Sequence, residues 1–250
     1  MLIQETCNKL GDMKLYGMLE AVRKRLDDPG HRDLSPTELI GLLVDDEWIY
    51  RENRKLTSLL KKARFKENSA CLEDIDYRPE RGLKKADILD LAQNRYVDAS
   101  QSVIITGPAG AGKSYLAQAL GNHACRKGFS VHYVRVPKLA YMFVQSRADG
   151  SYNAVLKRLG KYQLLILDDF GLAPLSEVEK QDLLELVEER YGSRSTMVTS
   201  QLPLKTWHEY LGSGRVADAL LERLVHNAHR FNLSANQSMR KKKVPLTTQE

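Results

Sequence analysis

Residues 102–120 of the chain read SVIITGPAGAGKSYLAQAL, and this stretch decides the fold. Residues 102–106 are rich in β-branched side chains, which predicts a buried strand. A glycine-rich segment follows, and the residues from 113 onward have apolar side chains at the spacing of a helix. The segment 107–114 fits the pattern GxxxxGK[S/T] in the order strand, loop, helix, which predicts a loop that binds the phosphates of a nucleotide.

The chemistry of such a loop explains its residue types. Small residues let successive backbone N–H groups curl around phosphate oxygens, and the following helix adds its unpaired N-terminal amides. We expect Lys113 to reach the β- and γ-phosphates and the hydroxyl of Ser114 to bind Mg²⁺. An ordinary glycine-rich turn is the alternative, and the flanking strand and helix disfavour it. The predicted ATP-binding residues are Gly107, Pro108, Ala109, Gly110, Ala111, Gly112, Lys113 and Ser114.

Short β-branched runs alternate with helical stretches over the rest of residues 100–250, which is typical of a parallel sheet with crossover helices. The third run, LLIL, is continuously apolar, as expected for a strand that is covered on both faces. The sequence therefore predicts an α/β fold with a five-stranded parallel sheet. The expected strands are 102–106, 130–136, 163–169, 195–200 and 229–233.

Two acids, Asp168 and Asp169, end the third of these runs. Ligands of open α/β sheets bind at the carboxyl ends of the strands, so these acids are expected to face the same crevice as the loop. Asp168 is the expected Mg²⁺ ligand, directly or through water, and Asp169 is placed to orient or deprotonate an attacking water. A plain strand-end turn built on two aspartates is the alternative.

The residues before 100 differ in pattern from those after it. Apolar residues from Leu10 to Leu26 recur three or four apart, and after Asp28-Pro29-Gly30 a second helix is expected from Ser35-Pro36 to about Ala63. We therefore predict a small all-helical N-terminal domain at residues 1–66, a connector at 67–99 and the nucleotide-binding domain at 100–250.

Composition narrows the class of protein. Of the 250 residues, 42% are hydrophobic and 28% charged, as in globular proteins. There is no apolar stretch long enough to span a membrane and no signal-peptide pattern, so the sequence predicts a cytoplasmic protein without a membrane partner. The three cysteines, Cys7, Cys71 and Cys125, lie far apart and are expected to be reduced.

The net charge of +6 favours anionic partners, and one segment concentrates positive charge. Residues 51–66 contain seven basic side chains and one acid. This run could be a solvated helix face, and its position at the end of a helix suits the helix dipole, but it is also a candidate for contact with DNA phosphates. The candidate residues are Arg51, Arg54, Lys55, Lys61, Lys62, Arg64 and Lys66. A second basic run occupies residues 240–243.

Five segments together resemble the IstB-type helper ATPases of insertion-sequence transposons, AAA+ proteins related to DnaC helicase loaders and DnaA initiators. The segments are KLYGMLEAVRKR (14–25), RENRKLTSLLKKARFKENSACLEDIDYRPERGL (51–83), GPAGAGKS (107–114), LLILDDFGL (164–172) and VTSQLP (198–203). The resemblance covers nearly the whole chain. It implies a bacterial Mg²⁺-dependent ATPase that binds double-stranded DNA with little sequence preference, forms homo-oligomers on it, selects target DNA and activates a partner transposase.

The resemblance also assigns roles to single residues. Residues 107–114 match the Walker A loop, and Asp168 and Asp169 match the Walker B acids. Ser200 or Gln201, at the end of the VTSQLP strand, matches the sensor of the γ-phosphate, and the spacing does not separate them. Arg223 in LLERL matches the arginine finger that a neighbouring protomer supplies in trans, with Arg230 as a weaker candidate. A surface salt bridge with Glu222 or Asp218 is the alternative for Arg223.

The sequence departs from related ATPases in two ways. Many AAA+ members carry a glutamate at the position of Asp169, whose carboxylate is set back by about one methylene. Only 17 residues follow the last expected strand, too few for a C-terminal helical lid, so we expect none and expect nucleotide to be held better between protomers. Two alternatives to the transposition helper remain: a DnaC-like loader of a replicative helicase, and a P-loop small-molecule kinase, which the basic helix and absent lid disfavour.

Overall fold

The computed structural model describes residues 2–26, 34–212, 214–234 and 239. It divides the chain into two compact units, Met1–Ser58 and Leu59–Glu250, which are described separately below. Within the described residues no helix is both long and apolar enough to cross a lipid bilayer.

The first unit is helical and contains α1 (Leu2–Asp12), α2 (Tyr16–Leu26) and most of α3 (Pro36–Ala63). One continuous helix was expected up to residue 26, and this expectation is wrong, because α1 ends in a left-handed turn at Lys14, with φ 59°. Lys14 N–H donates to the Gly11 carbonyl and Leu15 N–H to the Leu10 carbonyl, the two hydrogen bonds of a Schellman motif. The expected helix break at 28–30 lies outside the described residues.

The start of α3 follows the sequence. Ser35 Oγ accepts from Glu38 N–H at 3.3 Å, and Glu38 Oε2 accepts from Ser35 N–H at 2.8 Å. These reciprocal bonds form a capping box, with Pro36 at the first helical position. The helix ends at Ala63, as expected, and Arg64 then takes a left-handed conformation with φ 57°.

The second unit is built on the expected five-stranded parallel sheet, with strand order β2-β3-β4-β1-β5. Each strand lies within two residues of its predicted position, because the β-branched and apolar runs that mark them are local features of the sequence. The strands are β1 (Ser102–Thr106), β2 (Val131–Arg135), β3 (Leu164–Phe170), β4 (Ser195–Ser200) and β5 (Ala228–Asn232).

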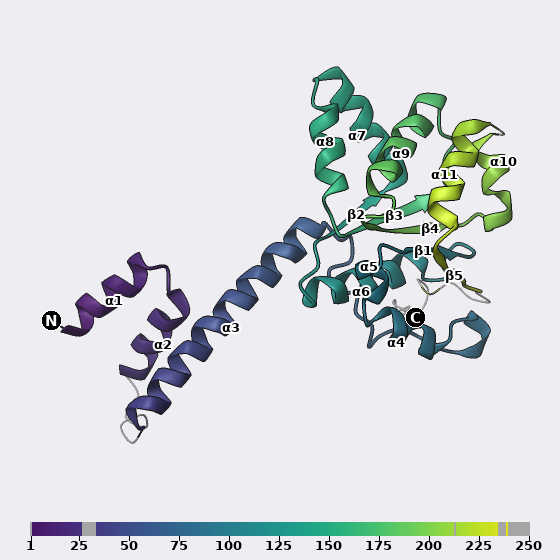
Figure 1. Cartoon of the computed structure of the whole chain (residues 1–250). Coiled ribbons are helices and arrows are strands. Elements are labelled where there is room, and N and C mark those ends of the chain that lie inside the picture. Colours follow the sequence, from purple (N-terminus) through teal and green to yellow (C-terminus); the bar gives the residue numbers. More distant parts are fainter. Residues whose placement is uncertain (1, 27–33, 213, 235–238, 240–250) are drawn as a thin grey trace, which may run out of the picture. The chain divides into compact units, whose positions relative to one another are not determined.

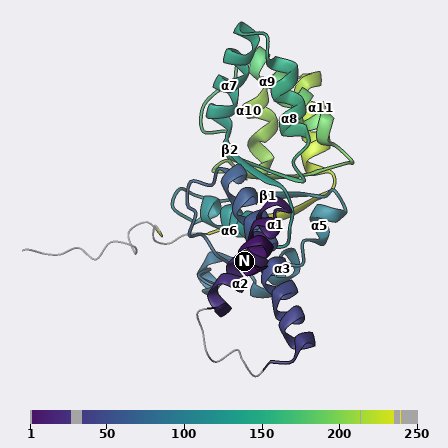
Figure 2. The same ribbon diagram turned by 90° about the vertical axis from the view of Figure 1, so that its left-hand side faces the viewer.

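Helices cover both faces of this sheet (Figures 1 and 2). One face carries α4 (Lys85–Leu91), α5 (Arg95–Asp98) and α6 (Lys113–Arg126). The other carries α7 (Val136–Ala148), α8 (Tyr152–Gly160), α9 (Glu177–Arg190), α10 (Trp207–Leu211) and α11 (Arg215–Val225). Two short 3₁₀ turns, η2 (Pro79–Arg81) and η3 (Leu204–Thr206), complete the unit. Among the described residues no helix follows β5.

The core lies between these layers. On the α7–α11 side, buried side chains such as Phe143, Leu165 and Trp207 form one apolar cluster. On the other side α6 approaches the sheet closely at Gly121, where a Cβ atom would lie 2.7 Å from Ile166 Cδ1. The fold class predicted from the sequence is thus confirmed.

The segment from Leu59 to Ala99 packs against α6 and β4 of the second unit. The side chain of Gln118 on α6 accepts from the backbone N–H groups of Lys66 and Glu67 at 2.7 and 2.8 Å. Ser195 Oγ donates to the Tyr96 carbonyl at 2.8 Å. The compact unit therefore begins before residue 66, and residues 67–99 belong to it through contacts with α6 and β4.

Candidate nucleotide site

The phosphate loop lies at the carboxyl end of β1, immediately before α6. Three of its residues, Gly107, Gly110 and Gly112, have φ values of 145°, 78° and 87°, which L side chains rarely adopt. At Gly107 a Cβ atom would also lie 2.3 Å from the Leu233 carbonyl oxygen. The backbone curl that a phosphate-binding loop needs is therefore present, and only glycine fits at its first position.

Lys113 is the first residue of α6, and its side chain turns back over the loop. Its Nζ donates to the Pro108 carbonyl at 2.8 Å, and the residue is only 6% exposed. A buried ammonium group bound to a carbonyl at the start of the loop is placed inside the curl where phosphates would enter. The position agrees with the role expected for this lysine.

Asp168 on β3 meets the loop directly. Its Oδ1 accepts from Ser114 Oγ at 2.8 Å and from Thr199 Oγ1, and its Oδ2 accepts from Tyr133 OH at 2.6 Å. Burial, and then the hydrogen bond to Asp168, raise the pKa of Tyr133, so its hydroxyl stays a donor. The carboxylate and the Ser114 hydroxyl are hard oxygen donors of the kind that Mg²⁺ prefers, so this pair fits the ion.

A β-bulge turns the two acids toward the same side of the sheet. Along β3 and β4, Leu167 pairs with Val198 but Phe170 pairs with Ser200, so β3 carries one extra residue. Asp169 takes that place with a left-handed φ of 59°. In a regular strand adjacent side chains point to opposite faces. Here both acids accept hydrogen bonds from one face of β2, Asp168 from Tyr133 and Asp169 from Arg135.

Arg135 is the partner of Asp169. Its Nε donates to Asp169 Oδ2 at 2.6 Å, and it lies two residues after Tyr133, on the same face of β2. The hydrogen bond to Asp169 raises the pKa of Arg135. Sequence reasoning gave no role to Tyr133 or Arg135. Tyr133 and Arg135 alternate with apolar residues at the end of the expected strand 130–136, and this pattern places them on one face. No feature of the neighbouring sequence indicated that they contact the acids.

The two sensor candidates at the end of β4 differ in burial. Ser200 is fully buried, and its Oγ donates to the Phe170 carbonyl at 2.7 Å and accepts from Leu202 N–H at 3.0 Å. Gln201 is exposed, and within the described residues its side chain has no recorded hydrogen bond. Thr199, which the sequence analysis missed, binds Asp168 and also accepts from Asp169 N–H at 3.2 Å.

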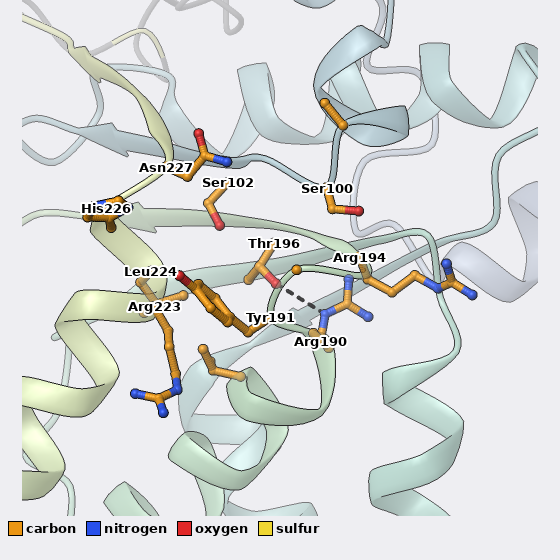
Figure 3. Close-up of a pocket in the computed structure, with 13 residues that line it drawn as sticks. Ser100, Ser102, Arg190, Tyr191, Arg194, Thr196, Arg223, Leu224, His226 and Asn227 are labelled. Atoms are coloured by element: carbon orange, nitrogen blue, oxygen red, sulfur yellow. Dashed lines mark hydrogen bonds between the residues drawn. The ribbon is translucent and has the colours of Figure 1, made fainter.

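Arg223 lies near the amino ends of the strands, whereas the loop of its own chain follows the carboxyl end of β1. Figure 3 shows Arg223 among the residues that line a pocket there. This pocket has a volume of about 300 Å³ and is lined by Ser102, which begins β1, and by Thr196 near the start of β4. Other lining residues are Ala99, Ser100, Val187, Arg190, Tyr191, Gly192, Arg194, Leu224, His226 and Asn227. Arg223 therefore faces away from the phosphates that its own chain would bind.

Arg223 forms an ion pair with Glu188 on α9 and donates from Nη1 to the Ala219 carbonyl at 2.9 Å. The alternative partners suggested by the sequence, Glu222 and Asp218, are wrong, since Asp218 pairs with His208 at 2.9 Å instead. Arg223 and Glu188 lie on different helices and far apart in the sequence, so the residue spacing within one helix could not reveal their contact.

Arg230, the weaker candidate for the arginine finger, is on β5. Its Nη2 donates to the Val225 carbonyl at 2.9 Å.

The seven basic residues of 51–66 are all exposed. Two of them have acidic partners, since Arg51 pairs with Glu47 at 2.7 Å and Lys55 lies 3.8 Å from Glu52. For the others, Arg54, Lys61, Lys62, Arg64 and Lys66, the described part of the chain provides no ion pair. The run divides between the units after Ser58. The second basic run, 240–243, lies outside the described residues.

Arg81 is a further residue at the loop that sequence reasoning missed. Its Nη2 donates to the Ala111 carbonyl at 2.7 Å, although residues 67–99 were expected to be only a connector. Pro79 and Gly82 on either side of it are turn residues, and they were the available signal that this segment is ordered.

Comparison with known proteins agrees with this geometry. A family profile described as IstB-like ATP binding protein matches residues 8–246. A protein of Sinorhizobium fredii named as an insertion sequence ATP-binding protein, y4pL, is 47% identical over 241 residues, covering 96% of this chain and 98% of its own. A protein of Mycobacterium tuberculosis named as an ATP-binding protein in an insertion sequence is 34% identical over 242 residues, with 96% of both chains covered.

The fold is similar to that of solved structures. AMPPCP-bound DnaA from Aquifex aeolicus is similar with a TM-score of 0.59 at 19% identity, over 73% of this chain and 57% of that chain. This likeness shows that the sheet and its helices have the same fold as the matching part of DnaA. With a family match over nearly its whole length, the chain belongs to the family of IstB-like ATP binding proteins.

Proposed function

We propose that the protein is an ATP-dependent DNA-binding helper of an insertion sequence. It forms oligomers on double-stranded DNA, selects target DNA and activates a partner transposase, and ATP hydrolysis resets the assembly. The convergence of the phosphate loop with Asp168 and Asp169 at one edge of the sheet carries the proposal. The relatives named for insertion sequences favour a transposase rather than a replicative helicase as the partner.

The residues at the loop suggest how hydrolysis proceeds. The loop amides bind the phosphates, and Lys113 neutralises charge on the β- and γ-phosphates. Ser114 and Asp168 would hold Mg²⁺, which neutralises and orients the phosphates when bound. Asp169 orients the attacking water, and Gln201, with its exposed side chain, is better placed than Ser200 to sense the γ-phosphate. A neighbour's Arg223 completes the site.

A reconstituted strand-transfer reaction tests the proposal. The transposase of the proposed insertion sequence is mixed with target DNA, with and without this protein and ATP. Insertion is expected only when both protein and ATP are present. Equal insertion without the protein would refute the helper role. Capture of a replicative helicase, with no effect on insertion, would favour the helicase-loader alternative.

Asp169→Asn is expected to separate hydrolysis from binding. The amide cannot accept a proton from water, so the hydrolysis rate should fall by about 10²- to 10⁴-fold. The affinity for ATP should change little, since the contacts to the loop are made by Asp168. Single-turnover hydrolysis and equilibrium ATP binding measure the two effects. Asp90→Asn, at an exposed position on α4, is the matched control and should leave both unchanged. Equal losses of binding and hydrolysis would instead make Asp169 a structural residue or a metal ligand.

DNA contact by the basic run predicts a salt effect. Each phosphate contact contributes about −0.9 to the slope of log affinity against log salt on duplex DNA. Replacing Lys61, Lys62 and Arg64 with Glu is therefore expected to flatten the slope by up to about 2.7, with ATP binding by the monomer unchanged. Fluorescence anisotropy of labelled duplex DNA across a series of salt concentrations measures this slope.

The control for this experiment reverses three other exposed basic residues of the same unit, Lys84, Lys85 and Arg95. That variant should keep the original slope. If the slope is the same for the wild type and for the variant of the basic run, this run is a solvated helix face. Little base preference is expected, because Asn53 is the only Asn or Gln of the run for reading base edges.

A further inference from the structure

The 3₁₀ turn η2 is fixed against both the loop and the end of β5. Arg81 N–H donates to the Arg78 carbonyl at 3.0 Å, and Gly82 N–H donates to the Pro79 carbonyl at 3.1 Å. The Arg81 carbonyl accepts from Ser234 N–H at 2.9 Å, and the next residue back, Leu233, lies against the loop at Gly107. The backbone of Arg81 is thereby held beside the phosphate loop.

The side chain of Arg81 points at the loop itself. Its Nη2 donates to the Ala111 carbonyl at 2.7 Å, and its Nη1 donates to the Asp76 carbonyl. The residue is 7% exposed, and its Nε is buried and finds no hydrogen-bond partner among the residues that the structure describes. A guanidinium whose hydrogen bonds go to backbone carbonyls keeps its full positive charge at this place.

The absence of a side chain at Gly112 leaves space for the Arg81 guanidinium. A Cβ atom at Gly112 would lie 2.8 Å from Arg81 Nη2, so the guanidinium occupies the space that a side chain would take. Gly112 directly precedes Lys113 and is the N-cap of α6, whose first amides point toward bound phosphates. The charge of Arg81 thus lies next to the part of the loop where an anion would bind.

Burial disfavours the charge of Arg81 more than the nearby acid stabilises it. Burial lowers the pKa of Arg81, while the nearby charge of Asp76 raises it, and burial is the larger of the two effects. A polyphosphate on the loop amides would offset the positive charge. A purely structural arginine would fix the loop equally well but would not make ligand affinity depend on ligand charge.

We propose that Arg81 is a positioning residue of the nucleotide site, which fixes the phosphate loop at Ala111 and adds a permanent positive charge beside the phosphate-binding amides. The proposal rests on the proposed binding of ATP.

The test compares Arg81→Gln and Arg81→Lys with the control Arg78→Gln, an exposed arginine of the same turn that pairs with Asp76 at 2.7 Å. Isothermal calorimetry measures dissociation constants for MgATP, MgADP, AMP and inorganic tripolyphosphate, and thermal unfolding reports the fold. Arg81→Gln is expected to weaken MgATP, MgADP and tripolyphosphate binding by about 10- to 100-fold, and AMP binding by less than about threefold. Arg81→Lys should stay within about fivefold of the wild type, because it keeps the charge. Arg78→Gln should match the wild type.

Two outcomes would overturn the proposal: wild-type MgATP affinity in Arg81→Gln, or equal losses for all four ligands in both Arg81 variants together with a lower melting temperature. The second outcome would leave Arg81 as a scaffold only. If Arg81→Gln does not fold, the Lys variant decides, since a role of charge requires that it retain the preference for polyphosphates over AMP. Failure of the wild type to bind MgATP would refute the proposed function instead, so the two failures can be told apart.

Discussion

Lys113→Ala is expected to abolish ATP-dependent assembly. The side chain supplies the main positive charge inside the loop, and its Nζ already lies against the Pro108 carbonyl at 2.8 Å. Charge-assisted hydrogen bonds contribute about 1.5 to 3 kcal/mol each, so ATP affinity should fall by about 100-fold or more. Equilibrium binding of a fluorescent ATP analogue and light scattering on DNA measure binding and assembly.

Lys127→Ala is the matched control, because this exposed lysine follows directly after the last residue of α6, the helix that Lys113 begins. It should bind ATP and assemble as the wild type does. Tight ATP binding and normal assembly by Lys113→Ala would mean that the phosphates bind elsewhere. A lower melting temperature in Lys113→Ala alone would point to damage to the fold, so thermal unfolding is measured alongside.

Mixing Arg223→Ala with Lys113→Ala is expected to restore DNA-stimulated hydrolysis, although each variant alone should be nearly inactive. Arg223 lies near the amino ends of the strands and the loop follows the carboxyl end of β1, so one chain cannot bring them together. At a mixed interface the intact loop of an Arg223→Ala protomer can meet the intact arginine of a Lys113→Ala protomer. An arginine supplied in trans raises hydrolysis by roughly 10³- to 10⁵-fold in GTPases.

The rescue should scale with the mixing ratio and disappear when DNA is left out. Lys127→Ala mixed with Lys113→Ala provides the reference for dilution of active protomers. Full hydrolysis by Arg223→Ala alone would remove the finger role and shift the candidate to Arg230. Because Glu188 holds Arg223 in the isolated chain, a functional Arg223 has to exchange this carboxylate for the neighbour's phosphate.

The fold was predictable because its signals are local. The β-branched runs located all five strands, and the glycines with the following lysine and serine identified the loop. The capping box at Ser35 and Glu38 also spans only four residues. Each of these features depends on neighbours in the sequence, which is the information that a pattern contains.

The missed features depend on residues far apart in the chain. Tyr133 and Arg135 reach the acids from a neighbouring strand, and Arg81 reaches the loop from a segment that has no periodicity. The bulge at Asp169 has no composition signal, since it results from the register between β3 and β4. The turn at Lys14 places a lysine where glycine is usual, so no breaker residue marked it.

The extra residue in β3 makes the second acid removable by deletion as well as by substitution. A chain one residue shorter at Asp169 would have one residue between Leu167 and Phe170, as β4 has between Val198 and Ser200, so the ladder between the two strands would run without interruption. The sheet would persist while Arg135 lost its carboxylate partner. If Asp169 acts in hydrolysis as proposed, such a length change would remove hydrolysis and leave nucleotide binding in place, because Asp168, which bonds Ser114 of the loop, lies before the deleted position.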